Sequence, residues 1–453
     1  MEIAELVKAQ RTYFETDATK DVAFRVAALT RLRQEILRRE KQLLHALQED
    51  LGKAPAEGYM TEVGMVLDEL GYLIKRTPRW AKCRRVRTPF AQFPARSFVL
   101  KEPYGVALIM APWNYPFQLT LEPLCGALAA GNCAVVKPSA YAPATSAAIA
   151  DLLSACFPQE YVAVVQGGRE QNSRLLEQKF DYIFFTGGIT VGKLVMQSAA
   201  RSLTPVSLEL GGKSPCIVDA TADLRLAAKR IAFGKLLNAG QTCVAPDYVL
   251  AQHSIKAELV RLLREEMAAM LGEHPERNPE YPAIINDKHF QRLQGLIRSA
   301  GVEPSTAPDR RIAPVVLPDV CEQDPVMGEE LFGPILPVLG FDRVADAVRF
   351  VKSRPRPLAL YLFTKDAGVQ RAVLHSVSFG GGCVNDTIIH LATHHMGFGG
   401  VGDSGMGSYH GRRSFDTFTH EKSIVSKALW LDLPFRYHPY TEKKERMVRR
   451  FLK

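Results

Sequence analysis

Short apolar segments alternate with longer mixed segments through residues 106–210. The apolar segments recur every 20 to 30 residues, and the stretches between them, such as residues 145–156, suit helices. The four clearest apolar segments are residues 106–110, 134–136, 161–165 and 182–185. Strands that alternate with helices are typical of βαβ units. The pattern therefore predicts a parallel sheet with helices packed on its faces.

A long helix precedes this region and a second series of strands and helices follows it. Residues 24–53 carry apolar side chains at near-helical spacing, with Arg and Glu between them and Gly52 near the end, which predicts an amphipathic helix. The second series begins near Leu208. Its helical segments are residues 257–271, 290–297 and 345–351. Residues 380–411 are rich in Gly, which predicts irregular loops that line a site or an interface.

Composition limits the class of protein. The chain has 453 residues, enough for roughly three compact units at about 150 residues per unit. Hydrophobic residues make up 47% and charged residues 23%, as in soluble globular proteins, so a disordered or fibrous protein is excluded. The net charge of +9 includes basic runs at residues 82–87 and 443–450. Short runs of this kind are usually solvated surface, so we expect no nucleic-acid partner.

Cysteine usage and the absence of leader features predict a cytoplasmic protein. Eight Cys occur without a CxxC pair, which is typical of a reducing compartment and excludes a disulfide scaffold or a zinc knuckle. The N-terminus has early acidic residues and no apolar segment of the secretory type. The longest stretches without charge, residues 103–121 and 123–136, contain turn formers, so no membrane span is expected.

Two glycine motifs compete as phosphate-binding turns. Residues 187–193 follow an apolar segment and precede a helical one, the context in which a helix N-terminus binds phosphate. Leu194 stands where a P-loop needs Ser or Thr, which disfavours an NTPase, and glycines kept only for turn geometry remain the alternative. Residues 397–402 match GxGxxG, but no strand directly precedes them, so this match is interpreted as false.

Cys243 is the strongest candidate nucleophile. It lies in a polar, Gly-containing loop after a helical segment, where an exposed thiol could ionise. A lone Cys is usually inert, so partners are needed. Glu209 interrupts an apolar strand, where a carboxylate is costly unless it acts as a base or has a buried partner. Asn114 follows a strand and offers an amide to an oxyanion. His394 and His395 have no ligand at metal-binding spacing, so no metal site is expected.

Six motifs in this order resemble the NAD(P)-dependent aldehyde dehydrogenases, most closely the class 3 branch. The resemblance runs from about Gly105 to Gly411. The motifs are APWNYPF at 111–117, LELGGKSP at 208–215, GQTC at 240–243, EELFGP at 329–334, FGGVG at 398–402 and SGMGSYHG at 404–411. The resemblance implies an α/β aldehyde dehydrogenase fold with a Rossmann-like cofactor domain, an α/β catalytic domain and a small bridging or oligomerisation element.

The resemblance also implies domain bounds and a homodimer. The expected parts are a cofactor domain at residues 1–83 and 102–210, a catalytic domain at 211–417, a bridging element at 84–101 with 418–432, and a basic tail at 433–453. Some class 3 relatives continue into a membrane anchor. This chain stops after a short basic segment, so we expect at most weak peripheral membrane contact by the tail.

By this resemblance Cys243 attacks the aldehyde carbon, while the Asn114 amide and the backbone N–H of Cys243 hold the oxyanion. Hydride passes to the nicotinamide, and water activated by Glu209 hydrolyses the thioester to the carboxylate. The residues expected around the cofactor are Trp113, Lys137, Ser139, Gly187, Gly188, Ile189, Thr190, Val191, Gly192, Leu210, Glu330 and Phe332. The residues expected near the substrate are Tyr115, Thr242, Ile388, Ile389 and His410, whose character fits aromatic or medium-to-long aliphatic aldehydes.

Two positions depart from the family pattern. Ala140 stands where the family commonly has a Glu that accepts hydrogen bonds from the adenosine ribose. Without that carboxylate nothing repels a 2′-phosphate, and Lys137 could attract one, so we expect NADP use at least comparable to NAD. Gly188 replaces a Ser or Asn and leaves only backbone donors at that point.

Two other functions compete with hydrolytic aldehyde oxidation. One is an acylating dehydrogenase that passes the thioester to coenzyme A, against which Glu209 argues because such relatives generally lack that base. The other is a catalytically silent binding protein, against which the presence of Cys243, Glu209, Asn114, Lys137 and Glu330 argues.

Overall fold

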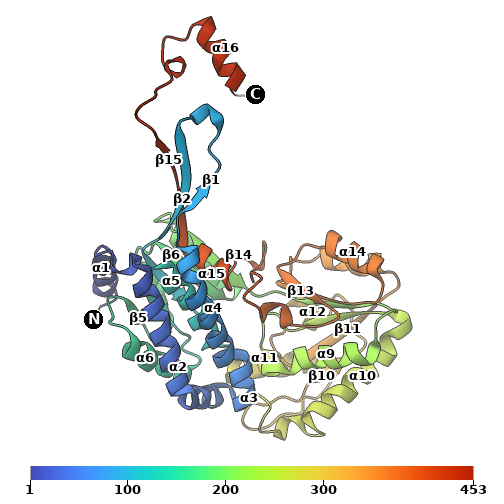
Figure 1. Ribbon diagram of the computed structural model, residues 1–453. Helices are drawn as coiled ribbons and strands as arrows, with labels where there is room; N and C mark the ends of the chain where they lie inside the picture. The colour runs from blue at the N-terminus through green and yellow to red at the C-terminus, as the bar shows by residue number, and fades with distance from the viewer. Residues whose placement is uncertain (1, 452–453) are drawn as a thin grey trace.

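The structure is a computed structural model that describes residues 2–451. Two six-stranded sheets and a long, thin arm make up the chain (Figure 1). Buried apolar side chains from both sheets form one continuous core. The mixed α/β architecture with parallel sheets is the one expected from the alternation of strands and helices.

The first sheet has the strand order β14-β7-β6-β3-β4-β5. Its strands are β3 (Val106–Met110), β4 (Cys133–Lys137), β5 (Val162–Val164), β6 (Tyr182–Gly187), β7 (Val206–Leu210) and β14 (Gly405–Met406). All neighbours are parallel except β14, which pairs antiparallel with β7. The helices around it are α1 (Ile3–Phe14), α2 (Val22–Leu51), α3 (Pro55–Gly58), α4 (Gly64–Trp80), α5 (Gln118–Ala130), α6 (Pro143–Cys156), α7 (Arg169–Leu176), α8 (Ile189–Ala200) and α15 (Arg412–Thr417).

Helix α2 is the amphipathic helix expected over residues 24–53. It begins where the Asp21 side chain accepts a hydrogen bond from the Ala23 N–H, and it ends at Gly52, whose φ of 65° suits a helix C-terminus. Its buried face includes Leu29, Leu32 and Ile36. This helix packs against α4 and α6 and leads directly into the segment that borders the candidate site.

The second sheet is parallel throughout, with the order β10-β11-β9-β8-β12-β13. Its strands are β8 (Pro215–Val218), β9 (Tyr248–Gln252), β10 (Val315–Leu317), β11 (Ile335–Phe341), β12 (Ala359–Phe363) and β13 (Gly381–Val384). The helices of this part are α9 (Leu224–Leu236), α10 (His253–Leu271), α11 (Asp287–Ser299), α12 (Pro325–Gly328), α13 (Val344–Lys352) and α14 (Ala367–Ser376).

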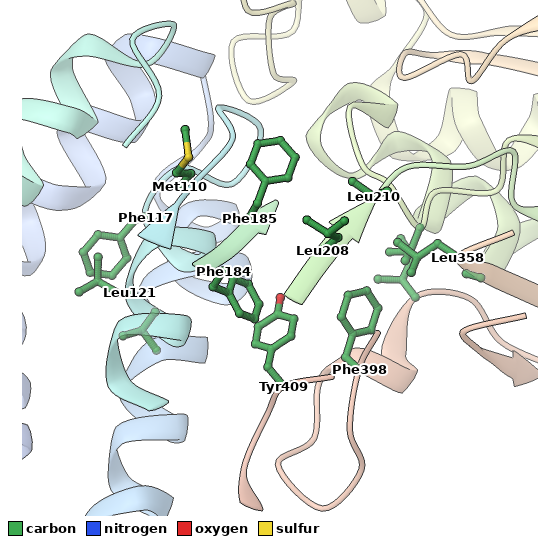
Figure 2. Close-up of a cluster of buried hydrophobic side chains, with 14 of the residues drawn as sticks. Met110, Phe117, Leu121, Phe184, Phe185, Leu208, Leu210, Leu358, Phe398 and Tyr409 are labelled. Atoms are coloured by element: carbon green, nitrogen blue, oxygen red, sulfur yellow. The ribbon is translucent and has the colours of Figure 1, made fainter. Parts of the chain in front are cut away.

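The Gly-rich segment after β13 returns to the first sheet. Gly405 of β14 pairs with Glu209 of β7, so a segment from the expected catalytic domain joins the sheet of the expected cofactor domain. A β-carbon at Gly405 would overlap the Leu208 carbonyl, and the φ of Gly405 is 134°, so glycine is required here. Figure 2 shows Phe398 and Tyr409 of this segment near Leu208 and Phe184 of the first sheet.

The arm comprises residues 82–101 and 419–451 and projects away from both sheets (Figure 1). It contains a three-stranded antiparallel sheet of β1 (Arg84–Val86), β2 (Ala95–Pro103) and β15 (Thr419–Lys427), followed by α16 (Glu442–Phe451). The basic run expected as a solvated tail is therefore a helix. The arm carries 14 Lys and Arg against 4 Asp and Glu, or +10, and the whole chain has +9. The rest of the molecule is thus nearly neutral.

Candidate active site

Three strands of the first sheet end at the same edge and place candidate residues there. Asn114 follows β3, the Gly187–Gly188 turn follows β6, and Glu209 lies near the end of β7. The carboxyl ends of parallel strands are where open α/β sheets bind ligands. Cys243 reaches the same region from the second part of the chain, in the loop after α9.

Two cavities meet at Cys243. An apolar cavity and a polar cleft share Leu119, Cys243, Phe398 and Tyr409 in their walls. The apolar cavity is further lined by Met60, Thr61, Met65, Tyr115, Gln118, Phe233, Leu237, Thr242, Val244, Ile388, Ile389, Leu391, Ala392 and His410. The polar cleft is further lined by Pro112, Trp113, Asn114, Thr186, Gly187, Gly188, Thr190, Glu209, Leu210, Gly211, Lys288, His289, Arg292, Glu329, Glu330, Phe332 and Leu358. A thiol at this junction can contact an apolar reactant on one side and a polar one on the other.

The Cys243 thiol is less exposed than its polar loop predicts. The structure half-buries Cys243, and burial raises the pKa of its thiol to about 12, with the charges of Glu330 and Glu209 acting in the same direction. Flanking polar residues indicated an exposed thiol, but Leu119, Phe398 and Tyr409, which are distant in sequence, close around it. The resting state at neutral pH is therefore the thiol rather than the thiolate.

Glu209 is a buried carboxyl group with unused hydrogen-bonding capacity. It is 3% exposed, lines the polar cleft, and neither carboxyl oxygen has a hydrogen-bond partner among the described residues. Burial raises its pKa well above the ordinary value. A buried polar group without a partner calls for an explanation, and a water molecule or a reacting group in the cleft would supply one.

Asn114 is held by hydrogen bonds on both its backbone and its side chain. Its carbonyl oxygen accepts from Lys53 Nζ at 3.1 Å and from Asn238 Nδ2 at 2.8 Å. Its Nδ2 donates to the Gln241 carbonyl at 3.1 Å. The amide nitrogen carries two hydrogens and Gln241 takes one, so the other is available to an oxyanion.

The loop before Cys243 has an unusual backbone. Asn238, Ala239 and Gly240 all have positive φ, with values of 52°, 51° and 74°. A β-carbon at Gly240 would overlap the Gly333 carbonyl, so only glycine fits. Conformations of this kind persist only where the surroundings hold them.

Hydrogen bonds to two distant segments hold this loop. The Asn238 N–H donates to Glu57 Oε1 at 2.7 Å. Gln241 Nε2 donates to the Ala283 carbonyl at 3.0 Å, and Gln241 Oε1 accepts from the Ile285 N–H at 3.0 Å. Sequence reasoning missed these contacts, because nothing in residues 53–63 or 283–285 signals chemistry.

The polar cleft gathers part of the expected cofactor set. Seven of those residues line it, namely Trp113, Gly187, Gly188, Thr190, Leu210, Glu330 and Phe332. The other five, Lys137, Ser139, Ile189, Val191 and Gly192, do not.

The five residues outside the cleft have identifiable surroundings. Lys137 ends β4, is buried, and donates from Nζ to the Pro138 carbonyl at 2.7 Å, and burial lowers its pKa to about 8. Ser139 is half-buried two residues further on. Ile189 and Val191 are exposed in the first turn of α8. Gly192 packs against Leu210, where a β-carbon would lie 2.6 Å from that side chain.

Glu330 and Phe332 are fixed by their neighbours in the cleft. A β-carbon at Gly211 would overlap the Glu330 carboxyl group, so this glycine permits the close approach. Burial raises the pKa of Glu330 to about 8, and Asp247 contributes in the same direction, while Oε1 of Glu330 has no partner among the described residues. The Phe332 ring packs edge-on against Trp113, with centroids 5.3 Å apart.

The residues of the cleft fit a dinucleotide. The turn after β6 leads into the N-terminus of α8, Gly188 has open space around it, and Glu330 presents an unpartnered oxygen that can accept from a ribose hydroxyl. The helix α11 adds Lys288, His289 and Arg292, which sequence reasoning missed because that helix reads as ordinary amphipathic packing. Two of these three are cationic, which suits an anionic ligand.

All five residues expected near the substrate line the apolar cavity. Tyr115 Oη lies 2.7 Å from Thr242 Oγ1, and both side chains are buried. Ile388 has a φ of 64°, which is rare for a β-branched residue. Met60, Phe233 and Ile389 are exposed and form an apolar rim. Met60, Met65, Phe233 and Leu237 could not have been selected from the sequence, since they read as ordinary helix residues.

Comparisons with known proteins agree on one family. Residues 1–424 match the aldehyde dehydrogenase family. The 4,4′-diaponeurosporen-aldehyde dehydrogenase of Staphylococcus aureus is 45% identical over 438 residues, which cover 96% of this chain and 95% of that protein. The dimeric NADP-preferring aldehyde dehydrogenase of Canis lupus familiaris is 41% identical over 450 residues, covering 98% and 99%. The solved structure of the substrate-bound state of S. aureus AldH has a TM-score of 0.98 at 44% identity and covers 100% of both chains.

Proposed function

The chain belongs to the aldehyde dehydrogenase family and is an NAD(P)-dependent aldehyde dehydrogenase, and on that premise we propose that it oxidises elongated apolar aldehydes to carboxylates through a thioester on Cys243. The observation that carries this proposal is the position of Cys243 at the junction of the apolar cavity and the polar cleft. The aldehyde occupies the apolar cavity and NAD(P) occupies the polar cleft, so both reach the sulfur.

The first step is addition of the Cys243 sulfur to the aldehyde carbon. Because burial favours the thiol, its proton leaves to water in the polar cleft as the S–C bond forms. The aldehyde oxygen becomes an oxyanion that accepts from Asn114 Nδ2 and from the backbone N–H of Cys243. A dinucleotide held in the polar cleft by residues such as Glu330 and Phe332 would supply the hydride acceptor for this step, which leaves a thioester on Cys243.

Glu209 then supports hydrolysis of the thioester. Glu209 lines the cleft, and neither of its oxygens has a hydrogen-bond partner among the described residues, so in its ionised form Glu209 can accept a proton from a water molecule that attacks the acyl carbon. The C–S bond breaks, the thiol regains a proton and the carboxylate leaves. This base distinguishes hydrolysis from transfer of the acyl group to coenzyme A.

The apolar cavity supports an elongated, apolar substrate. Its walls are aliphatic and aromatic side chains apart from Thr61, Gln118, Thr242, Cys243 and His410, and its rim is exposed and apolar. Burying apolar surface there contributes about 0.8 kcal/mol per methylene group. The S. aureus relative is named for a diaponeurosporen aldehyde, which agrees with a long apolar substrate.

NADP use at least comparable to NAD is the second part of the proposal. Ala140 is exposed next to the end of β4 and offers no carboxylate to repel a 2′-phosphate. Lys137 lies three residues earlier at the edge where the cofactor strands end. The canine relative is named as NADP-preferring.

The arm supports a homodimer. Of 26 large apolar side chains that are exposed in the described part of the chain, 10 lie on its 53 residues, among them Val425, Leu429 and Trp430. Exposure on this scale marks an interface. Among residues 2–451, no helix is both long and apolar enough to cross a membrane. The two sheets and the arm support a cofactor domain, a catalytic domain and a bridging element, although β14 and α15, inside the expected 211–417 range, lie with the first sheet.

We propose a reducing, cytoplasmic location, which the cysteines support. All eight are free thiols, and four of them, Cys125, Cys133, Cys156 and Cys216, are buried in the core.

The test is a turnover assay of the purified protein with propanal, decanal and benzaldehyde, each with NAD+ and with NADP+. We expect reduced cofactor and carboxylate in equal amounts, one ¹⁸O from labelled water in the product, and higher kcat/KM for decanal than for propanal. Coenzyme A should leave the product unchanged. Formation of an acyl-CoA, or no cofactor reduction with any of the aldehydes, would overturn the proposal.

A further inference from the structure

Residues 53–63 lie against three separate pieces of the active site. The segment follows the end of α2 at Gly52 and contains α3 and a π-helical turn, Tyr59–Val63. Single π-helical turns occur frequently at functional sites. Lys53, Glu57 and Glu62 point inward from this segment, and all three are hydrogen bonded to other parts of the chain.

Lys53 and Glu62 form a buried ion pair. Both side chains are fully buried, and Lys53 Nζ lies 2.5 Å from Glu62 Oε1. Glu62 Oε2 accepts from the Phe117 N–H at 2.8 Å and from the Gln118 N–H at 3.3 Å, at the start of α5. The carboxylate therefore fixes the end of the loop that begins at Asn114.

Lys53 fixes the beginning of the same loop. Its Nζ donates to the Asn114 carbonyl at 3.1 Å and lies 4.0 Å from the centre of the Tyr115 ring. The Asn114 carbonyl also accepts from Asn238 Nδ2. The ion pair thus holds residues 114–118 at both ends and connects them to the loop that carries Cys243.

Fold stability alone does not account for the ion pair, because desolvation offsets much of the attraction between buried charges. Replacing both members of such a pair by neutral groups is often neutral or stabilising, whereas removing one leaves an uncompensated charge. Positioning and stability can therefore be separated experimentally by comparing a single with a double substitution.

We propose that Lys53 and Glu62 are positioning residues that hold the Asn114 amide where the oxyanion forms. The inference rests on the proposed role of Asn114. The ion pair touches neither the substrate nor the cofactor, and it acts through the backbone of residues 114–118. Its loss slows the steps that form an oxyanion and leaves cofactor binding unchanged.

The experiment compares Lys53→Met, Lys53→Met with Glu62→Gln, and Asn114→Ala. Lys53→Met alone should lower Tm, because Glu62 is left buried and unpaired. The double variant should recover Tm but lose about 10²-fold in kcat/KM, the scale of a misplaced catalytic group. In the double variant, kcat/KM should show a primary isotope effect with 1-deuterated aldehyde, while the Kd for NADPH should equal the wild-type value. Lys41→Met, at an exposed position on α2, is the matched control for loss of one Lys and should match the wild type.

A double-mutant cycle with Asn114→Ala tests whether the ion pair of Lys53 and Glu62 acts through Asn114. If the pair acts through Asn114, adding Lys53→Met and Glu62→Gln to Asn114→Ala should lower kcat/KM by less than about threefold, because coupled residues are not additive. A full further loss of about 10²-fold, or wild-type kcat/KM in the double variant, would overturn the inference. Wild-type kcat/KM in Asn114→Ala would instead overturn the proposed oxyanion role.

Glu62→Gln alone keeps the test decisive if the double variant does not fold. It retains an oxygen acceptor for α5 and should lower kcat/KM about tenfold with the isotope effect present. Wild-type kinetics in this variant would overturn the inference.

Discussion

Gly405 pairs with Glu209 across the antiparallel contact between β14 and β7. The pairing brings the C-terminal Gly-rich segment over the one strand that carries a carboxyl group into the polar cleft. A β-carbon at Gly399 of the same segment would lie 3.1 Å from Glu209 Oε1. The segment thus excludes bulk solvent from Glu209 on one side and leaves the cleft as the side from which water reaches it.

Glu209→Gln should separate the two halves of the reaction. The variant keeps the shape of the cleft but removes the base, so turnover should fall by about 10²- to 10⁴-fold. Stopped-flow absorbance should still show one equivalent of NAD(P)H per active site, because hydride transfer precedes hydrolysis. Wild-type steady-state turnover in the variant would remove Glu209 from the mechanism.

Glu209→Gln should also stabilise the fold relative to the wild type, by an amount that increases as pH rises. The ordinary pKa of Glu is 4.5, and burial raises that of Glu209 well above it in the folded state. Above pH 4.5 the unfolded chain loses this proton while the folded chain keeps it, so ionisation favours the unfolded state until the folded pKa is reached. The difference in Tm between Glu209→Gln and wild type should therefore grow between about pH 5 and pH 8, measured by calorimetry. A difference that shrinks over this range would contradict the pKa direction.

Alkylation should report the pKa of Cys243. With a thiol pKa of about 12, inactivation by iodoacetamide in a Cys83→Ser, Cys321→Ser background should keep accelerating through pH 10. Glu330→Gln removes a negative charge that raises this pKa, so the same rate should be reached at lower pH. A plateau near pH 7 in the wild type would show a preformed thiolate.

Ala140→Glu should move cofactor preference toward NAD. The new carboxylate would repel a 2′-phosphate and accept from ribose hydroxyls, so kcat/KM for NADP+ should fall about 10- to 100-fold, the size of a 1.4 to 2.7 kcal/mol change. Steady-state kinetics with both cofactors measure the ratio. Ala140→Gln is the matched neutral control and should change the ratio much less. An unchanged ratio in Ala140→Glu would remove this position from cofactor selection.

Charges placed on the arm should weaken a dimer. Leu429→Asp with Trp430→Asp puts two carboxylates at positions that are 100% and 73% exposed in one chain. If a second copy covers them, light scattering should show a monomer at concentrations where the wild type is a dimer. Leu203→Asp, at a 90% exposed position on the body, should leave the mass unchanged. The same mass for the arm variant and wild type would place the interface elsewhere.

Local pattern predicted the strands and helices well where each follows a repeated hydrophobic period. The segments at 106–110 and 182–185 became β3 and β6, and residues 24–53 became α2 with the expected end at Gly52. Long apolar runs are buried whatever residues flank them, so the hydrophobic period alone is enough to predict these elements. The two residues of β14 are too short to carry a period, so their pairing with β7 could only be seen in three dimensions.

The residues that hold the active-site loops could not be predicted from the sequence, for a different reason. Lys53 follows α2 and Glu62 lies in a π-helical turn, and charged residues in such segments usually face solvent. Their burial depends on residues 114–118, which are about 60 positions away. The state of Cys243 was misjudged in the same way, because its burial comes from Phe398 and Tyr409, which lie over 150 residues further along. Residue types that can act in catalysis are recognisable from the local sequence, whereas the burial and contacts of those residues are not.

The two cavities that meet at the Cys243 sulfur open to solvent at different places. The apolar cavity opens at the rim of Met60, Phe233 and Ile389, and the polar cleft at the exposed Gly188, Lys288 and Glu329. On the proposed function, aldehyde and carboxylate pass through the apolar opening, and the oxidised and reduced dinucleotide pass through the polar one. Neither product blocks the exit of the other. The carboxylate should therefore compete only with the aldehyde, and the reduced dinucleotide only with the oxidised one.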